Sequence, residues 1–226
     1  MGTMKALLAA VGLWGALAAD EAQALSIRLV DLLGGDGTVT IADNGALDLD
    51  STDGSITLVR LGFGGFTTST SIASAMTGAT DELFGQFAAM SRQASGGVGV
   101  RLLVSETGFD AQSGAHPFSF SLTSNPGASA EVSVTTFVDD SNALFGTATE
   151  VGSVTSSDGA SDSDFGDGFL ALSGLYSVTH VIDVTHDAAA MSNGDARYVS
   201  AIPTPAALPL LLGGLGGLAA IRRRRA

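Results

Sequence analysis

The feature that most constrains the fold is a series of turn signals, spaced roughly 8–12 residues apart up to residue 65 and more widely beyond it. Asn-Gly and Asp-Gly pairs supply the positive φ angles that two-residue hairpin turns require. The signals stand at residues 34–37, 44–45, 53–54, 64–65, 96–97, 125–127, 158–159 and 193–194. This spacing leaves room for short strands and little room for helices.

Between the turns lie runs rich in β-branched residues, in which apolar and polar residues alternate. Residues 118–122, for example, place two phenylalanines and a leucine on one face and two serines on the other. The predicted strands are residues 26–32, 38–42, 55–61, 99–105, 118–123, 131–138 and 176–185. Short strands without helical interludes predict an all-β fold, a single antiparallel β-sandwich (jelly-roll or Ig-like) of roughly eight to ten strands.

Residues 80–92 also fit a helix, because Thr80 can act as an N-cap and Leu83 and Phe87 are four positions apart. Gly85 interrupts this pattern, and the glycine-rich stretch that follows leads into another strand as a hairpin would. We therefore predict a strand here.

Composition excludes several classes of function. Residues 25–202 contain 21 acidic and 5 basic residues, a net charge of −16. Nucleic-acid binding is not expected, since clusters of Lys and Arg that neutralise phosphates are lacking. The chain has no cysteine, which excludes disulfides, thiolate catalysis, cysteine-ligated zinc and iron–sulfur clusters.

The N-terminus has the parts of a secretory signal peptide. Lys5 provides a positive start, residues 6–19 form an apolar run, and Ala22 and Ala24 form a small-x-small cleavage site. The 14-residue run would cover about 21 Å of a bilayer core of about 30 Å, so it is too short to span the membrane. Residues 1–24 are predicted to be a signal helix that signal peptidase removes after Ala24, so the protein is expected to be exported.

The C-terminus carries a second apolar segment, residues 206–221, which is followed by an arginine cluster. Two prolines hold the chain extended just before it. The arginines are expected to stay in the cytoplasm, which places the preceding domain outside the inner membrane. The predicted functional residues of this segment are Pro203, Pro205, Ala206, Arg222, Arg223, Arg224 and Arg225.

This tail resembles the sorting signal of PEP-CTERM proteins of Gram-negative bacteria, in its VPLPA variant. Residues 202–206, Ile-Pro-Thr-Pro-Ala, stand where Val-Pro-Leu-Pro-Ala is usual. The resemblance implies that the C-terminal transmembrane helix tethers the protein transiently and that an exosortase-type enzyme then removes it. The implied organisation is a signal peptide (1–24), a β-sandwich domain (25–202) and a sorting signal (203–226). The implied location after processing is the cell surface or the extracellular space.

The resemblance extends less specifically into the body of the chain. Residues 104–109, 139–146 and 176–186 are similar to segments that precede the tag in β-rich PEP-CTERM proteins of unassigned activity. It therefore implies no catalytic residue and no cofactor.

Residues that could carry chemistry are few. His180 and His186 fall on one face of a predicted strand but about 20 Å apart, so they cannot share a metal ion. His116 is expected at the start of a strand with an exposed side chain. No nucleophile elbow, phosphate-binding loop or His-Glu-x-x-His sequence occurs. Glu106 and Asp110 are the acid pair considered for a secreted hydrolase.

Aspartates cluster at residues 48–54 and 158–168. An EF-hand is excluded, because position 12 counted from Asp162 is Ser173 and not the required Glu. A looser calcium loop is the alternative, but we interpret both clusters as solvated acidic loops that keep the protein soluble and blunt sheet edges. No cofactor and no metal are expected.

Three functions follow from these observations. The first is an exported surface or extracellular-matrix protein without catalytic activity. The second is a module that binds carbohydrate or exopolysaccharide, which an exposed aromatic strip would favour. The third is a secreted hydrolase, which two converging buried acids would favour.

Overall fold

The computed structural model describes residues 25–33, 35–76, 80–91, 97–111 and 114–201. These residues form twelve strands in two six-stranded sheets, in which every neighbouring pair is antiparallel. Sheet A consists, in spatial order, of β2 (Thr38–Ala42), β1 (Ser26–Asp31), β6 (Val98–Asp110), β11 (Leu175–His186), β8 (Ala130–Asp139) and β9 (Thr149–Ser157). Sheet B consists of β10 (Asp162–Leu172), β7 (Gly114–Asn125), β12 (Met191–Ala201), β5 (Thr80–Ser91), β4 (Phe66–Met76) and β3 (Ser55–Phe63).

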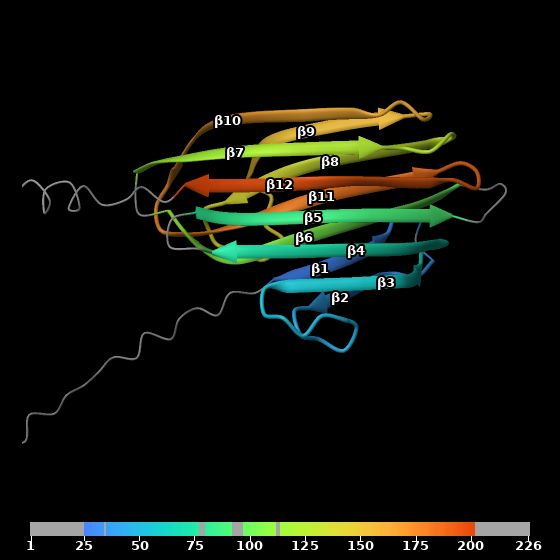
Figure 1. Ribbon diagram of the computed structural model, residues 1–226, viewed down its shortest axis with the longest axis horizontal. Coiled ribbons are helices and arrows are strands. Elements are labelled where there is room, and N and C mark those ends of the chain that lie inside the picture. The colour runs from blue at the N-terminus through green and yellow to red at the C-terminus, as the bar shows by residue number, and fades with distance from the viewer. Residues whose placement is uncertain (1–24, 34, 77–79, 92–96, 112–113, 202–226) are drawn as a thin grey trace, which may run out of the picture.

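Figure 1 shows sheet B in front of sheet A, with strands of the two sheets running in nearly the same direction. The predicted all-β architecture of two antiparallel sheets is confirmed, and Thr80–Ser91 is a strand as predicted. The predicted count of eight to ten strands was too low, because β4, β9, β10 and β12 were not recognised. Within the described residues, no helix has the length and apolar character needed to cross a membrane. The predicted signal and sorting helices lie outside those residues.

The core lies between the sheets and is built from the inward-facing residues of each alternating strand. Tyr176 and Tyr198 are the largest fully buried side chains, one from each sheet. Tyr176 stacks on Phe109 at a ring separation of 5.4 Å, and Tyr198 stacks on Phe118 at 6.0 Å. Burial of each such large apolar side chain contributes about 1.5–3 kcal/mol to stability.

All three histidines lie in this interior and link strands of opposite sheets. His180 on β11 contacts Thr136 Oγ1 through Nδ1 (2.7 Å) and the carbonyl of Leu83 on β5 through Nε2 (3.2 Å). With Nε2 as the donor, Nδ1 accepts from the threonine hydroxyl, so both ring nitrogens are satisfied.

His186 lies farther along β11 and bonds Ser91 Oγ at 3.0 Å and Ser192 Oγ at 2.8 Å, both in sheet B. His116 on β7 bonds Tyr176 of sheet A at 3.3 Å and also Ser200 of its own sheet. The expectation that His116 is exposed was wrong: the imidazole is fully buried, because β7 is covered by sheet A at this point. As predicted, His180 and His186 share one face of their strand.

Burial lowers the pKa of His180 to about 4, against about 6.5 in an unfolded chain. The neutral ring is therefore favoured in the folded state, and this stability is present above pH 6.5 and lost as the pH falls toward 4. We expect the stability advantage of the wild type over a His180→Gln variant to shrink by about 3 kcal/mol between pH 7 and pH 4. Urea unfolding of both proteins at the two pH values measures it, and a difference that does not change with pH would contradict the buried neutral ring.

Candidate functional site

A row of polar residues crosses the outer face of sheet B from one edge to the other. The register aligns Thr57 on β3 with Gln86 on β5 by way of Ser71 on β4, and aligns Gln86 with Asp195 on β12. The same register continues from Asp195 to Thr123 on β7 and then to Ser163 on β10. We call Thr57, Gln86, Asp195, Thr123 and Ser163 the polar row.

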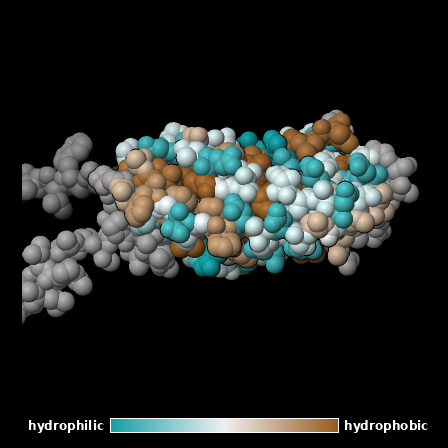
Figure 2. All heavy atoms as spheres, turned by 90° about the horizontal axis from the view of Figure 1, so that it is seen from above, coloured by the Kyte–Doolittle hydropathy of each residue, from teal (hydrophilic) through white to brown (hydrophobic). Residues whose placement is uncertain are grey.

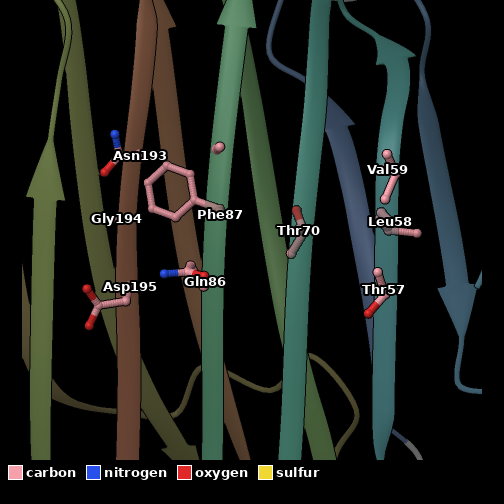
Figure 3. Close-up of a pocket in the computed structure, with 10 residues that line it drawn as sticks. Thr57, Leu58, Val59, Thr70, Gln86, Phe87, Asn193, Gly194 and Asp195 are labelled. Carbon is pink, nitrogen blue, oxygen red and sulfur yellow. The ribbon is translucent and has the colours of Figure 1, made fainter. Parts of the chain in front are cut away.

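Two hollows lie along this row and meet at Asp195, which lines both. The first has a volume of about 420 Å³ and extends over β3, β4, β5 and β12. Figure 3 shows its labelled residues on these four neighbouring strands, with Gln86 beside Asp195. The second has a volume of about 450 Å³ and extends from β12 over β7 to β10. Together they form what we call the sheet-B groove.

The floor of the groove depends on a close approach between β5 and β12. Phe87 points inward and its ring lies against Gly194 (Figure 3); a Cβ at Gly194 would stand 2.8 Å from the ring and 2.4 Å from the carbonyl oxygen of Thr123. The prediction that Asn193 and Gly194 form a turn was therefore wrong. Gly194 lies instead in the middle of a strand, where the absence of a side chain leaves space for the Phe87 ring.

Hydrogen bonds hold the central side chains of the groove in place. The Thr123 hydroxyl donates to Asp195 Oδ2, and the Asp195 backbone N–H lies 3.2 Å from that hydroxyl oxygen. Asn125 Nδ2 donates to Asn193 Oδ1 at 3.3 Å in the next row. The groove thus presents hydroxyl, amide and carboxylate groups whose positions are set before any ligand binds.

The charge of the groove is acidic. Asp195 and Asp162 line it, and none of the described residues that line the two hollows is Lys or Arg. Arg197, which also points outward from β12, is paired with Glu82 at 2.8 Å. A ligand with many negative charges would meet repulsion along this surface.

Two exposed phenylalanines lie on the edge strand β10, one of them close to the end of the groove. Phe165 and Phe169 are 79 % and 73 % exposed, point to the outer face and are four residues apart. Phe165 is two residues from Ser163 of the polar row and pairs with Ser121 of β7. Figure 2 views the molecule from the side of β9 and β10 and shows hydrophobic patches among hydrophilic ones. This is the aromatic strip that the sequence could not locate.

The aspartates of residues 43–54 serve mainly to hold their own loop. Asp43 accepts the N–H of Gly54 at 2.8 Å, and Asp48 accepts the N–H groups of Asp50 and Thr57 through one oxygen at 2.9 and 3.0 Å. Asp50 accepts Thr52 N–H and Ser55 Oγ–H, and these hydrogen bonds lower the pKa of Asp50. Each of these carboxylates is thus directed at a turn.

The second acidic cluster was predicted to be a loop, and this was wrong beyond Asp158 and Gly159. Those two residues form the turn, while residues 162–168 belong to β10. Asp162, Asp164 and Asp167 therefore lie on an edge strand of sheet B, where charge opposes pairing with another sheet edge. Among the described residues, no group of three or more His, Asp or Glu side chains is arranged to hold a metal ion.

A cluster of titratable side chains with shifted pKa values lies in the interior between the two sheets. His116 contacts Ser200 and Tyr176, while Asp81 and Tyr198 are close enough to affect each other's ionisation. Burial raises the pKa of Asp81 to about 6 and that of Tyr176 to about 12. All five side chains are at most 2 % exposed, so the cluster lies between the sheets and does not open to the surface.

The acid pair considered for hydrolysis consists of one buried and one exposed residue of the same strand, β6. Glu106 is 1 % exposed, and Asp110, the last residue of the strand, is exposed. Between them the pairing with β11 shifts in register and Gly108 has a positive φ, so the strand is irregular here. Of the two carboxyl groups, only that of Asp110 is open to solvent.

No protein-family model matches the chain, and no curated protein is significantly similar to it. Among solved structures, TmCBM61 in complex with β-1,4-galactotriose is 10 % identical with a TM-score of 0.33, and the match covers 57 % of this chain and 86 % of that one. The enzymatically active domain of bacteriophage CBA120 tailspike protein 4 is 9 % identical, with a TM-score of 0.33 and coverage of 62 % and 21 %. Arthrobacter globiformis T6 isomalto-dextranase complexed with panose is 14 % identical, with a TM-score of 0.26 and coverage of 78 % and 30 %. Such low values establish no relationship.

The groove was missed by sequence reasoning because its residues come from distant segments. Their only common signal is that each is the polar member of an alternating strand, which is true of many residues. The site residues predicted for export and sorting lie outside the described residues: Ala22, Ala24, Pro203, Pro205, Ala206, Arg222, Arg223, Arg224 and Arg225.

The buried carboxyl of Asp81 gives a second pH dependence, of opposite sign to that of His180. Its pKa in the folded state, about 6, lies above the unfolded value of 3.8. The protonated form is therefore favoured by folding, and this stability is present below pH 3.8 and lost as the pH rises through 6. We expect Asp81→Asn to gain about 3 kcal/mol relative to wild type between pH 4 and pH 8.

Thermal or urea unfolding of both proteins across this pH range measures the gain. Glu131→Gln, on the exposed outer face of sheet A, is the control and should follow the wild type. A variant curve parallel to that of the wild type would show that Asp81 is not held in its protonated form.

Proposed function

We propose that this chain is an exported surface or extracellular-matrix protein without catalytic activity, and that it binds polysaccharide along the sheet-B groove. The observation that carries the binding proposal is the polar row, which has members on five of the six strands of sheet B and runs along two hollows that meet at Asp195. With strands about 4.8 Å apart, the row is roughly 24 Å wide, enough for several linked sugar units.

The chemistry of the groove suits sugar hydroxyl groups. Thr57 can donate and accept hydrogen bonds, Gln86 and Asn193 offer both an amide donor and an amide acceptor, and Asp195 accepts. The Thr123 hydroxyl, which donates to Asp195, can accept from a ligand. Phe165 offers an exposed ring at the β10 end, on which the apolar face of a sugar ring can stack. Polar groups held in position before binding lose little conformational freedom when they bind, which favours affinity.

The acidic lining selects the kind of polysaccharide. Uronate or sulfate groups would be repelled by Asp195 and Asp162, and the described lining supplies no cation to pair with them. The proposed ligand is therefore a polysaccharide without acidic groups.

The export part of the proposal rests on the two ends of the sequence. The N-terminal segment has the pattern of a signal peptide, and the C-terminal segment resembles a PEP-CTERM sorting signal. Strand β1 begins at Ser26 and strand β12 ends at Ala201, so removal of both segments would leave every strand of the two sheets in place.

Binding can be tested with a panel of soluble polysaccharides, using affinity electrophoresis and then calorimetry. We expect binding to a neutral member such as a galactan, glucan or glucomannan, and none to alginate or polygalacturonate. Gln86→Ala and Asp195→Ala should each weaken binding roughly tenfold, because each removes hydrogen bonds to the ligand.

The control for these variants is Glu131→Ala, which removes an exposed acid from the outer face of sheet A. It should bind as the wild type does. Failure of every polysaccharide to bind, or an equal loss in the control variant, would rule out the groove as the binding site.

Processing can be tested by mass spectrometry of the protein isolated from its native surface. We expect the mature chain to begin at Leu25 and to lack Arg222, Arg223, Arg224 and Arg225. An intact arginine tail on mature surface protein would replace the sorting interpretation with a permanent membrane anchor.

A further inference from the structure

A third hollow, of about 220 Å³, adjoins the groove at the β3 edge of sheet B. Its lining is apolar and includes Leu47, Leu49, Val59 and Leu61. Leu49, Val59 and Leu47 are 68 %, 55 % and 45 % exposed. Exposed apolar side chains that gather around a hollow commonly mark a binding surface.

The hollow is built by specific backbone contacts. The Leu49 N–H donates to the carbonyl of Thr57 at 3.0 Å, and the Thr57 N–H donates to Asp48 Oδ1 at 3.0 Å, which fastens the segment to the edge of β3. On β3 itself, a shift in register between Leu58 and Leu61 interrupts the regular pairing with β4. The loop and the irregular strand together hold the leucines at the surface.

This apolar hollow continues the groove. It shares Leu58 and Val59 with the 420 Å³ hollow, which in turn shares Asp195 with the 450 Å³ hollow. At the junction, Thr57 provides a hydroxyl group on the groove side, and Val59, two residues along β3, and Leu49 provide apolar surface on the other. A group that fits here has a hydrogen-bond acceptor on one side and a small apolar part on the other.

We propose that the Leu47–Leu49–Val59 hollow binds the methyl group of an acetylated sugar residue, and so makes the groove selective for acetylated neutral polysaccharides. The carbonyl of the acetyl group would accept from the Thr57 hydroxyl, while its methyl group would contact the leucines and Val59. This rests on the proposed function and adds to it the chemical class of the ligand. An acetyl ester or amide carries no charge, which suits the acidic lining of the groove.

The proposal is tested with two pairs of neutral ligands: a pair of β-1,4-linked tetrasaccharides that differ by an acetamido group in place of a hydroxyl at C2, and a pair of polysaccharides that differ only in acetylation. Calorimetry and affinity electrophoresis compare tetra-N-acetylchitotetraose with cellotetraose, and an acetylated glucomannan with its alkali-deacetylated form. We expect the acetylated member of at least one pair to bind roughly tenfold more tightly, from one buried methyl group and one added hydrogen bond.

Leu49→Asn should remove this preference while leaving the binding of the deacetylated form unchanged. Leu144→Asn, an exposed leucine on the β8–β9 loop of the opposite sheet, is the matched control and should keep the preference. Asp195→Ala should instead weaken both forms alike, because it acts in the groove and not in the apolar hollow.

The outcomes separate the two proposals. Equal binding of both forms, or an unchanged preference in Leu49→Asn, overturns the acetyl site and leaves polysaccharide binding intact. Failure of all four ligands and of the polysaccharide panel overturns both. A concentration-dependent dimer of the wild type that Leu49→Asn dissociates would show that a second copy of the chain occupies the hollow, and would also overturn the acetyl site.

Discussion

The structure depends on the way in which two sheets bury polar side chains between them. His180 and His186 are fully enclosed, yet each ring bonds residues of the opposite sheet and therefore keeps the two layers in one relative position. A slip of β11 by one residue would turn both rings outward and leave their partners without hydrogen bonds, at a cost of about 1–3 kcal/mol for each buried group. Apolar packing alone tolerates such shifts more readily.

The same strand register fixes the positions of the side chains on the outer face of sheet B. Because side chains alternate, an inner row of Leu58, Phe87 and Gly194 sets the positions of their neighbours Thr57, Gln86 and Asp195 on the outside. The contact of Phe87 with Gly194 is therefore as important to the groove as the polar residues that line it. A binding surface on a sheet of this kind is as rigid as the core beneath it.

The acidic residues of the domain have different structural roles, which depend on their position in the fold. Asp43 and Asp48 hold a loop by accepting backbone N–H groups, Asp164 lies on an exposed edge strand, and Asp195 lines the groove. Their shared charge makes the lining of the groove acidic, which is the basis for proposing a ligand without negative charge. Arg197, by contrast, is paired with Glu82 beside the groove.

The sequence by itself determined that this chain forms β-strands and where most of them lie, because alternation and turn residues are local properties. Even Thr80–Ser91, which also fits a helix, was identified from its glycine. Only the tertiary structure decided that His116 is buried, that Gly194 accommodates a ring and that Thr57, Gln86 and Asp195 are neighbours. The period of a strand specifies which residues share a face. Some strand pairs join consecutive strands, but the pair at the centre of the groove, β5 and β12, brings together residues more than a hundred positions apart, such as Gln86 and Asp195, and no local pattern encodes that contact.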